Sequence, residues 1–145
     1  MINFIDGTID LGTRSIHTAC NSDDLHALAK EGLIDERETG EGRVYYYFET
    51  VSDGLRFGIF IRLRQKKIEW LRLNWLDSPM KAWDDVSEKA LVDEYRLLSD
   101  FVEKSVKKES DTKKNRQRTW HLKWGNVEVS YEPRSFQTNI FIVPR

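Results

Sequence analysis

The sequence predicts an α+β fold in which a mostly antiparallel sheet carries two helices packed on one face. Three observations lead to this prediction. Short apolar runs with a period of two residues recur along the chain, turn pairs such as Asp-Gly separate them, and only two segments show the apolar spacing of a helix. The expected order of elements is ββ-α-βββ-α-βββ, and a length of 145 residues suits a single domain, 1–145.

The first expected elements are a hairpin and a short helix. Residues 2–5 and 8–11 flank an Asp-Gly pair, in which Gly7 tolerates the positive φ of a type I′ turn. Asn21 offers a side-chain oxygen that can cap the first turn of a helix, and Gly32 is a suitable residue to end it. This helix is short, so its stability must come from packing.

The middle of the chain predicts an antiparallel meander. Three strand-like runs, residues 43–51, 55–64 and 68–76, are joined by two short turns. Apolar and polar side chains alternate in the second run, which is typical of a sheet with one buried face. An acidic connector with two glycines, residues 33–42, leads into the meander, and we expect it to be flexible.

The second half predicts a long helix and three further strands. Residues 85–108 place apolar side chains at helical spacing, with acids near the start and lysines near the end. Residues 109–118 contain no apolar side chain, which indicates a mobile charged loop. Residues 119–124, 127–131 and 136–143 then alternate as strands.

These periods predict which side chains form the core. The apolar face of the meander and that of the long helix should meet, because each element has only one such face. The residues expected to be buried together are Ile59, Ile61, Leu71, Leu73, Leu98 and Val102. On the opposite face of the meander, Tyr47, Phe60 and Trp70 are expected to cover one another.

Composition excludes several classes of protein. The formal net charge is −1, so the total charge favours neither nucleic acid nor a membrane as a partner. The single cysteine, Cys20, rules out an internal disulfide, and no run approaches the roughly 20 apolar residues of a membrane helix. The N-terminus lacks the features of a signal peptide, so a cytoplasmic location is expected.

No residue set indicates a reaction, a metal or a cofactor. His17, His26 and His121 have no ligand-type neighbour at the spacing of a metal motif, and a zinc site from His17, Cys20 and His121 would need a tertiary contact. Surface histidines are the simpler interpretation. Adjacent carboxylates, such as Asp93 with Glu94, are interpreted as solvated surface. We therefore expect no catalytic residue, no metal site and no cofactor.

Two alternative functions remain open at this point. One is a small ligand-binding or enzymatic domain with a pocket between the sheet and the long helix. The other is a nucleic-acid-binding adaptor that uses the basic face of the meander. The basic residues that would serve this adaptor are Arg62, Arg64, Lys66, Lys67, Lys113, Lys114, Arg116 and Arg118. The negative net charge argues against it, so no nucleic-acid partner is expected.

The outline of the chain resembles the small bacterial immunity proteins of polymorphic-toxin and contact-dependent growth inhibition systems. The resemblance lies in a short hairpin ending in Leu11-Gly12-Thr13, the order of helices and meander, and the closing segments Trp124-Gly125-Asn126-Val127 and Ile140-Phe141-Ile142. It implies a cytosolic α+β protein that binds one cognate toxin domain and blocks it, with nucleases among the toxin classes. It assigns no binding residue.

The expected contact with such a toxin lies on two acidic segments. These segments concentrate negative charge in a chain that is nearly neutral in total, and loops can present charge without disturbing a core. Trp83 is the expected hydrophobic anchor, because aromatic residues rimmed by charge are common at protein interfaces. The predicted partner-binding residues are Asp35, Glu36, Glu38, Glu41, Asp77, Trp83, Asp84, Asp85 and Glu88.

Overall fold

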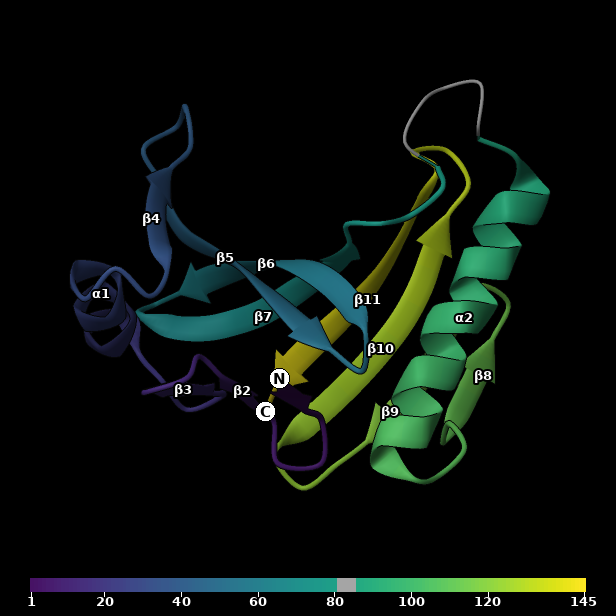
Figure 1. Cartoon of the computed structure of the whole chain (residues 1–145), viewed down its shortest axis with the longest axis horizontal. Helices are drawn as coiled ribbons and strands as arrows, with labels where there is room; N and C mark the ends of the chain where they lie inside the picture. The colour runs from purple at the N-terminus through teal and green to yellow at the C-terminus, as the bar shows by residue number, and fades with distance from the viewer. Residues whose placement is uncertain (81–85) are drawn as a thin grey trace.

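The computed structural model describes residues 1–80 and 86–145 and confirms the α+β fold. Two antiparallel sheets and two helices make up this part of the chain (Figure 1). Neither helix is long and apolar enough to cross a membrane. The elements are β1 (Ile2–Asn3), β2 (Thr8–Asp10), β3 (Ser15–His17), α1 (Ser22–Lys30), β4 (Asp35–Glu38), β5 (Val44–Ser52), β6 (Leu55–Arg64), β7 (Lys67–Trp75), α2 (Glu88–Val106), β8 (Thr112–Lys114), β9 (Gln117–His121), β10 (Gly125–Glu132) and β11 (Gln137–Pro144).

The large sheet has eight strands in the order β4-β5-β6-β7-β11-β10-β9-β8. Its register aligns the apolar positions of neighbouring strands, so that Ile61 lies opposite Leu71 and Leu73 lies opposite Ile140. One face of the sheet therefore carries a continuous apolar surface. All six residues expected in the core are buried, each with 2% or less of its surface exposed.

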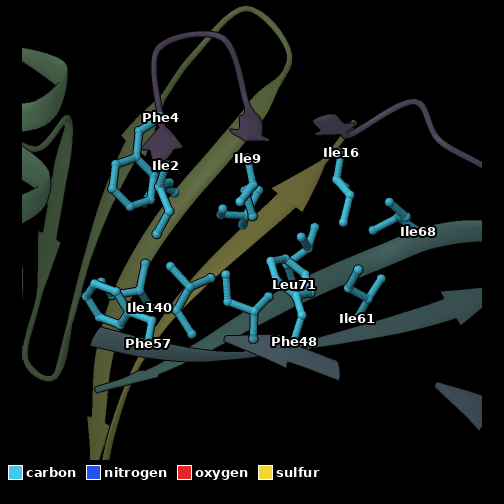
Figure 2. Packing of buried hydrophobic residues seen from close by; sticks show 14 of the residues in the cluster. Ile2, Phe4, Ile9, Ile16, Phe48, Phe57, Ile61, Ile68, Leu71 and Ile140 are labelled. Carbon is cyan, nitrogen blue, oxygen red and sulfur yellow. The ribbon is translucent and has the colours of Figure 1, made fainter. Parts of the chain in front are cut away.

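The small sheet, β1-β2-β3, covers part of that apolar face. Figure 2 shows Ile2, Phe4, Ile9 and Ile16 of this N-terminal region pointing toward side chains of the large sheet, among them Phe57. The expected hairpin of residues 2–5 and 8–11 is confirmed by the pairing of β1 with β2. The third strand of this sheet, β3, was not predicted.

Both helices contribute to the same core cluster, as expected for helices packed on one face. Helix α1 begins at the predicted cap, where Asn21 and Asp24 form a reciprocal capping box. Helix α2 begins after Ser87, whose side chain accepts a hydrogen bond from the Ala90 amide, and it packs against β10 and β11. The helices lie toward opposite ends of the sheet in Figure 1.

Trp124 fixes the N-terminal hairpin to the end of the large sheet. Its indole Nε1–H donates to the carbonyl oxygens of Phe4 at 2.9 Å and Ile5 at 3.1 Å. The ring lies directly against Gly7, where an added Cβ would approach it to 2.6 Å. Gly7 also has φ +68°, so both space and backbone conformation require glycine there. The Trp-Gly segment thus has a structural role.

Two segments predicted as loops contain edge strands. The acidic connector of residues 33–42 includes β4, which pairs with β5, and the charged segment of residues 109–118 includes β8 and the start of β9. The interpretation of these two segments as loops was therefore wrong. Every side chain of β4 and β8 is exposed, so backbone pairing alone defines both strands and the sequence carries no apolar pattern for them. Short, charged edge strands also resist pairing with other chains.

Glu94 was predicted to be solvated, and this prediction was wrong. It lies on the buried face of α2 with 7% of its surface exposed, and its Oε1 has no hydrogen-bond partner within residues 1–80 and 86–145. Burial raises the pKa of Glu94 above its ordinary value, and hydrogen bonds from Ser78 and Thr138 offset part of this shift. The ionised carboxylate therefore destabilises the folded state.

Replacing Glu94 with glutamine should stabilise the fold at pH 7. Because the folded-state pKa is raised, the wild-type protein loses stability as the pH rises from the ordinary pKa of glutamate through the raised value. Below both values the carboxyl is protonated in both states, so the difference between Glu94→Gln and wild type should vanish. Urea unfolding at pH 4 and pH 7 measures this, with the exposed neighbour Asp93→Asn as control. An equal difference at both pH values would contradict it.

Candidate interaction surface on the open sheet face

The face of the large sheet opposite the core carries half-buried rings together with arginines, of which Arg72 is half-buried and the others are exposed. Both helices and the small sheet contribute to the core on the other side, and no described helix covers this face. A sheet face exposed to water normally carries polar side chains. We call this surface the aromatic–arginine face; its residues are Tyr45, Tyr47, Phe60, Trp70 and Phe141, with Arg37, Arg62 and Arg72.

Strand pairing arranges these side chains in two rows. The first row runs across four strands through Tyr47, Phe60, Arg72 and Phe141, each opposite the next. The Tyr47 and Phe60 ring centroids lie 4.8 Å apart. The ring of Tyr47 lies over Gly58, where an added Cβ would come within 2.7 Å of the tyrosine oxygen. Glycine at this position of β6 therefore leaves the space that the Tyr47 ring occupies.

The second row runs through Arg37, Tyr45, Arg62 and Trp70. Arg62 lies over the Trp70 ring at 5.8 Å. Trp70 also meets Phe141 of the first row edge to face, with centroids 5.6 Å apart. The expectation that Tyr47, Phe60 and Trp70 cover one another is confirmed for Tyr47 and Phe60, whereas the ring contact of Trp70 is with Phe141.

Most arginines on this face are already paired with a carboxylate. Arg62 Nε lies 3.1 Å from Glu69, and Arg37 lies 3.3 Å from Asp35 and 4.3 Å above the Tyr47 ring. Such exposed pairs add little stability, but they neutralise the local charge. Two of the three arginines on this face are therefore both paired with a carboxylate and stacked on a ring.

Arg72 differs from the other arginines. Its guanidinium lies over Phe60 at 4.7 Å and over Trp70 at 5.8 Å, and it forms no ion pair with a described residue. Its Nε is buried and has no hydrogen-bond partner among the described residues. Burial lowers the pKa of Arg72 from its ordinary value, although an arginine remains charged at physiological pH. It is a stacked and partly desolvated cation.

A shallow depression of about 1310 Å³ covers part of this face and continues to the β4–β5 and β6–β7 turns. Phe60, Trp70 and Arg72 lie among its lining residues. Five basic side chains and two carboxylates line it, which leaves an excess of three positive charges in a chain whose formal net charge is −1. The depression is on the side of the sheet away from α2, unlike the pocket expected for a ligand-binding domain.

The first predicted acidic segment lies on β4 and the turn that follows it. Asp35 pairs with Arg37, while Glu36 accepts a hydrogen bond from the Tyr46 hydroxyl at 2.8 Å and lies 3.0 Å from His26. The hydrogen bonds to His26 and then Tyr46 lower the pKa of Glu36. These two acids thus have partners within the chain. Glu38 and Glu41 are exposed, and Glu41 also borders the depression.

The second predicted acidic segment lies away from the first. Asp77 pairs with Arg56 at 3.0 Å, and Glu88 is the exposed first residue of α2. Figure 1 shows β4 and the start of α2 at opposite sides of the molecule. The structure therefore does not bring the two segments together. The remaining predicted residues, Trp83, Asp84 and Asp85, lie outside the described residues.

The other sequence candidates also stay separate. His26 lies against Glu36, and His121 Nδ1 lies 2.9 Å from the Asn126 side-chain oxygen. Within residues 1–80 and 86–145, no group of three or more potential ligands could hold a metal ion. The two basic groups of the nucleic-acid alternative lie around the β6–β7 turn and on β8–β9, with β10 and β11 between them in the sheet.

Comparisons of the chain with protein-family models, with curated proteins and with solved structures found no match. No residue role therefore carries over from another protein. The sequence did contain a signal for the aromatic–arginine face, because rings and arginines alternate with core residues at Phe60 and Arg62 and again at Trp70 and Arg72. The stacking itself depends on the strand register, which the sequence did not predict.

Proposed function

We propose that this protein is an inhibitor that binds a cognate toxin domain, and that it does so through the aromatic–arginine face. The observation that supports this most strongly is the face itself: half-buried rings with arginines over them, on a sheet face that no described helix covers. Tyrosine, tryptophan and arginine are the residues enriched at the energetic centres of protein interfaces. The toxin as partner follows from the resemblance of the chain to immunity proteins.

The surface has the composition and the rigidity that tight protein binding requires. Its side chains come from paired strands, so little backbone order is lost on binding. Stacking on rings also restricts the arginines before a partner arrives, as at Arg37 over Tyr47 and Arg72 over Phe60. Preorganised anchors of this kind favour slow dissociation.

Nucleic acid fits this face less well than a protein does. Single-stranded nucleic acid binds by stacking bases on free ring faces and by contacting phosphates with free cations. Here guanidinium groups lie over Tyr47, Phe60 and Trp70, and Glu69 pairs with Arg62. A nucleic acid would have to displace these contacts.

The experiment is co-expression with candidate toxin domains, chosen first from any toxin gene found next to the gene for this chain. We expect the chain to restore growth and to form a stable complex with the purified toxin domain. A chain that neither protects nor binds would show the proposal to be wrong. Submicromolar binding of a 12-nucleotide single-stranded RNA, without toxin binding, would instead support the nucleic-acid alternative.

A further inference from the structure

We propose that Arg72 is a receptor for a carboxylate, supplied by an acidic segment of the protein partner. This inference rests on the proposed function for the identity of the partner as a toxin domain. The chemistry of the contact follows from this chain alone. Arg72 lies in the lining of the depression, stacked on rings and without an acid of its own among the described residues.

The environment of Arg72 makes a carboxylate the best-matched ligand. A guanidinium presents its N–H groups in a fork that fits both oxygens of a carboxylate. Stacking on Phe60 and Trp70 orders the side chain in advance, so less conformational freedom is lost on binding. The Nε–H is buried and has no partner among the described residues, so the contact falls to the terminal N–H groups of the half-buried guanidinium, and a partly desolvated cation gains more from an ionised acceptor than a solvated one does.

The surroundings indicate a segment with several acids. Arg43 and Lys66 also line the depression, and neither side chain forms an ion pair with a described residue. Arg62 and Arg64 are both near Glu69, so they contribute less free charge. The remaining positive charges around Arg72 would attract acids that neighbour the one it binds. Electrostatic complementarity of this kind raises the rate and the specificity of association.

The test uses peptides as probes, so it requires no toxin. A blocked tetraglutamate peptide, the matching tetraglutamine peptide and a thymidine tetranucleotide are titrated into the ¹⁵N-labelled full-length protein. The side-chain Nε–H signal of Arg72 is followed by NMR in the wild type, and the indole N–H signal of the neighbouring Trp70 is followed in the wild type and in every variant. We expect tetraglutamate to shift these signals with saturation, tetraglutamine to leave them unchanged, and the tetranucleotide to bind more weakly than tetraglutamate.

Two substitutions at Arg72 make the assignment specific. Arg72→Gln should weaken tetraglutamate binding by about tenfold or more, since it removes a charge-assisted hydrogen bond. Arg72→Lys should weaken it nearly as much, because a lysine keeps the charge but loses the fork and the stacking. The control is Arg96→Gln, which removes an exposed arginine on α2 and should leave binding unchanged. Thermal unfolding verifies that each variant is folded.

The outcomes separate this inference from the proposed function. Equal affinity of wild type and both Arg72 variants for tetraglutamate overturns the inference, as does equal binding of the two peptides. Tighter binding of the tetranucleotide at Arg72 also overturns it and favours a phosphate ligand. If the chain protects against the toxin while the Arg72 variants bind it normally, the proposed function stands and the inference fails. If tetraglutamate binds through Arg72 but the toxin does not bind, the inference about Arg72 stands and the proposed function fails.

Discussion

Replacing Leu98 with alanine is expected to lower the free energy of unfolding by about 2–5 kcal/mol. Leu98 is completely buried on the face of α2 that packs against the large sheet. The substitution removes apolar contacts and leaves a cavity that the surrounding strands can only partly fill. Urea unfolding of the wild type and the variant measures the effect.

The adjacent residue provides a matched control. Leu97 is 38% exposed on the same helix, so Leu97→Ala removes the same atoms from a position outside the buried face. It should change stability by no more than about 0.5 kcal/mol, as for most surface substitutions. Similar losses for the two variants would contradict the assignment of the buried face of α2.

Replacing Trp70 with alanine should raise the dissociation constant for the toxin domain by about 30-fold or more, the size expected for an interface hot spot. Trp70 contacts Phe141 and has two arginines over its ring, so it connects the two rows of the aromatic–arginine face. Its loss removes a large contact area and also removes one ring on which Arg62 and Arg72 stack. The main effect should be on the dissociation rate.

Binding kinetics on immobilised toxin domain provide the measurement, with Leu97→Ala as the control from the other side of the molecule. Because Trp70 is half-buried, the stability of the variant is measured first, and binding is compared well below its unfolding temperature. A Trp70→Ala variant that is folded and dissociates like the wild type would exclude this face as the centre of the interface.

The core could be predicted from the sequence because it depends on local periods. Ile59 and Ile61 alternate with Phe60 and Arg62, and strand pairing then only had to align faces that were already defined. The same logic fails at sheet edges. Strand β4 and strand β8 contain no apolar side chain. Their sequences therefore show no alternation of apolar and polar residues from which a strand could be predicted.

The burial of Glu94 could have been predicted from helical spacing. It lies three residues after Leu91 and four before Leu98, which places all three side chains on one face of a helix. Its charge, together with the neighbouring acid Asp93, favoured a solvated position. Glu94 is buried because its position on the helix, and not its charge, determines which way its side chain faces.

The candidate interaction surface depends on information that one strand does not contain. Arg72 meets Phe60 only because β6 and β7 pair in one register, and a shift in that register between Arg62 and Leu63 sets where the last residues of β6 lie. The acidic segments stood out in the sequence by charge alone, yet Asp35 and Glu36 have partners within the chain. Their role in partner binding stays a prediction.

An NMR footprint of the complex tests most directly whether the aromatic–arginine face binds a toxin domain. Unlabelled toxin domain is added to the labelled chain, and the signals of the Trp70 indole, the Arg72 Nε–H and the Leu97 methyl groups are compared. We predict that the Trp70 and Arg72 signals shift or broaden at one equivalent of toxin domain, while the Leu97 signals stay in place. Changes at Leu97 with unchanged Trp70 and Arg72 signals would contradict the account.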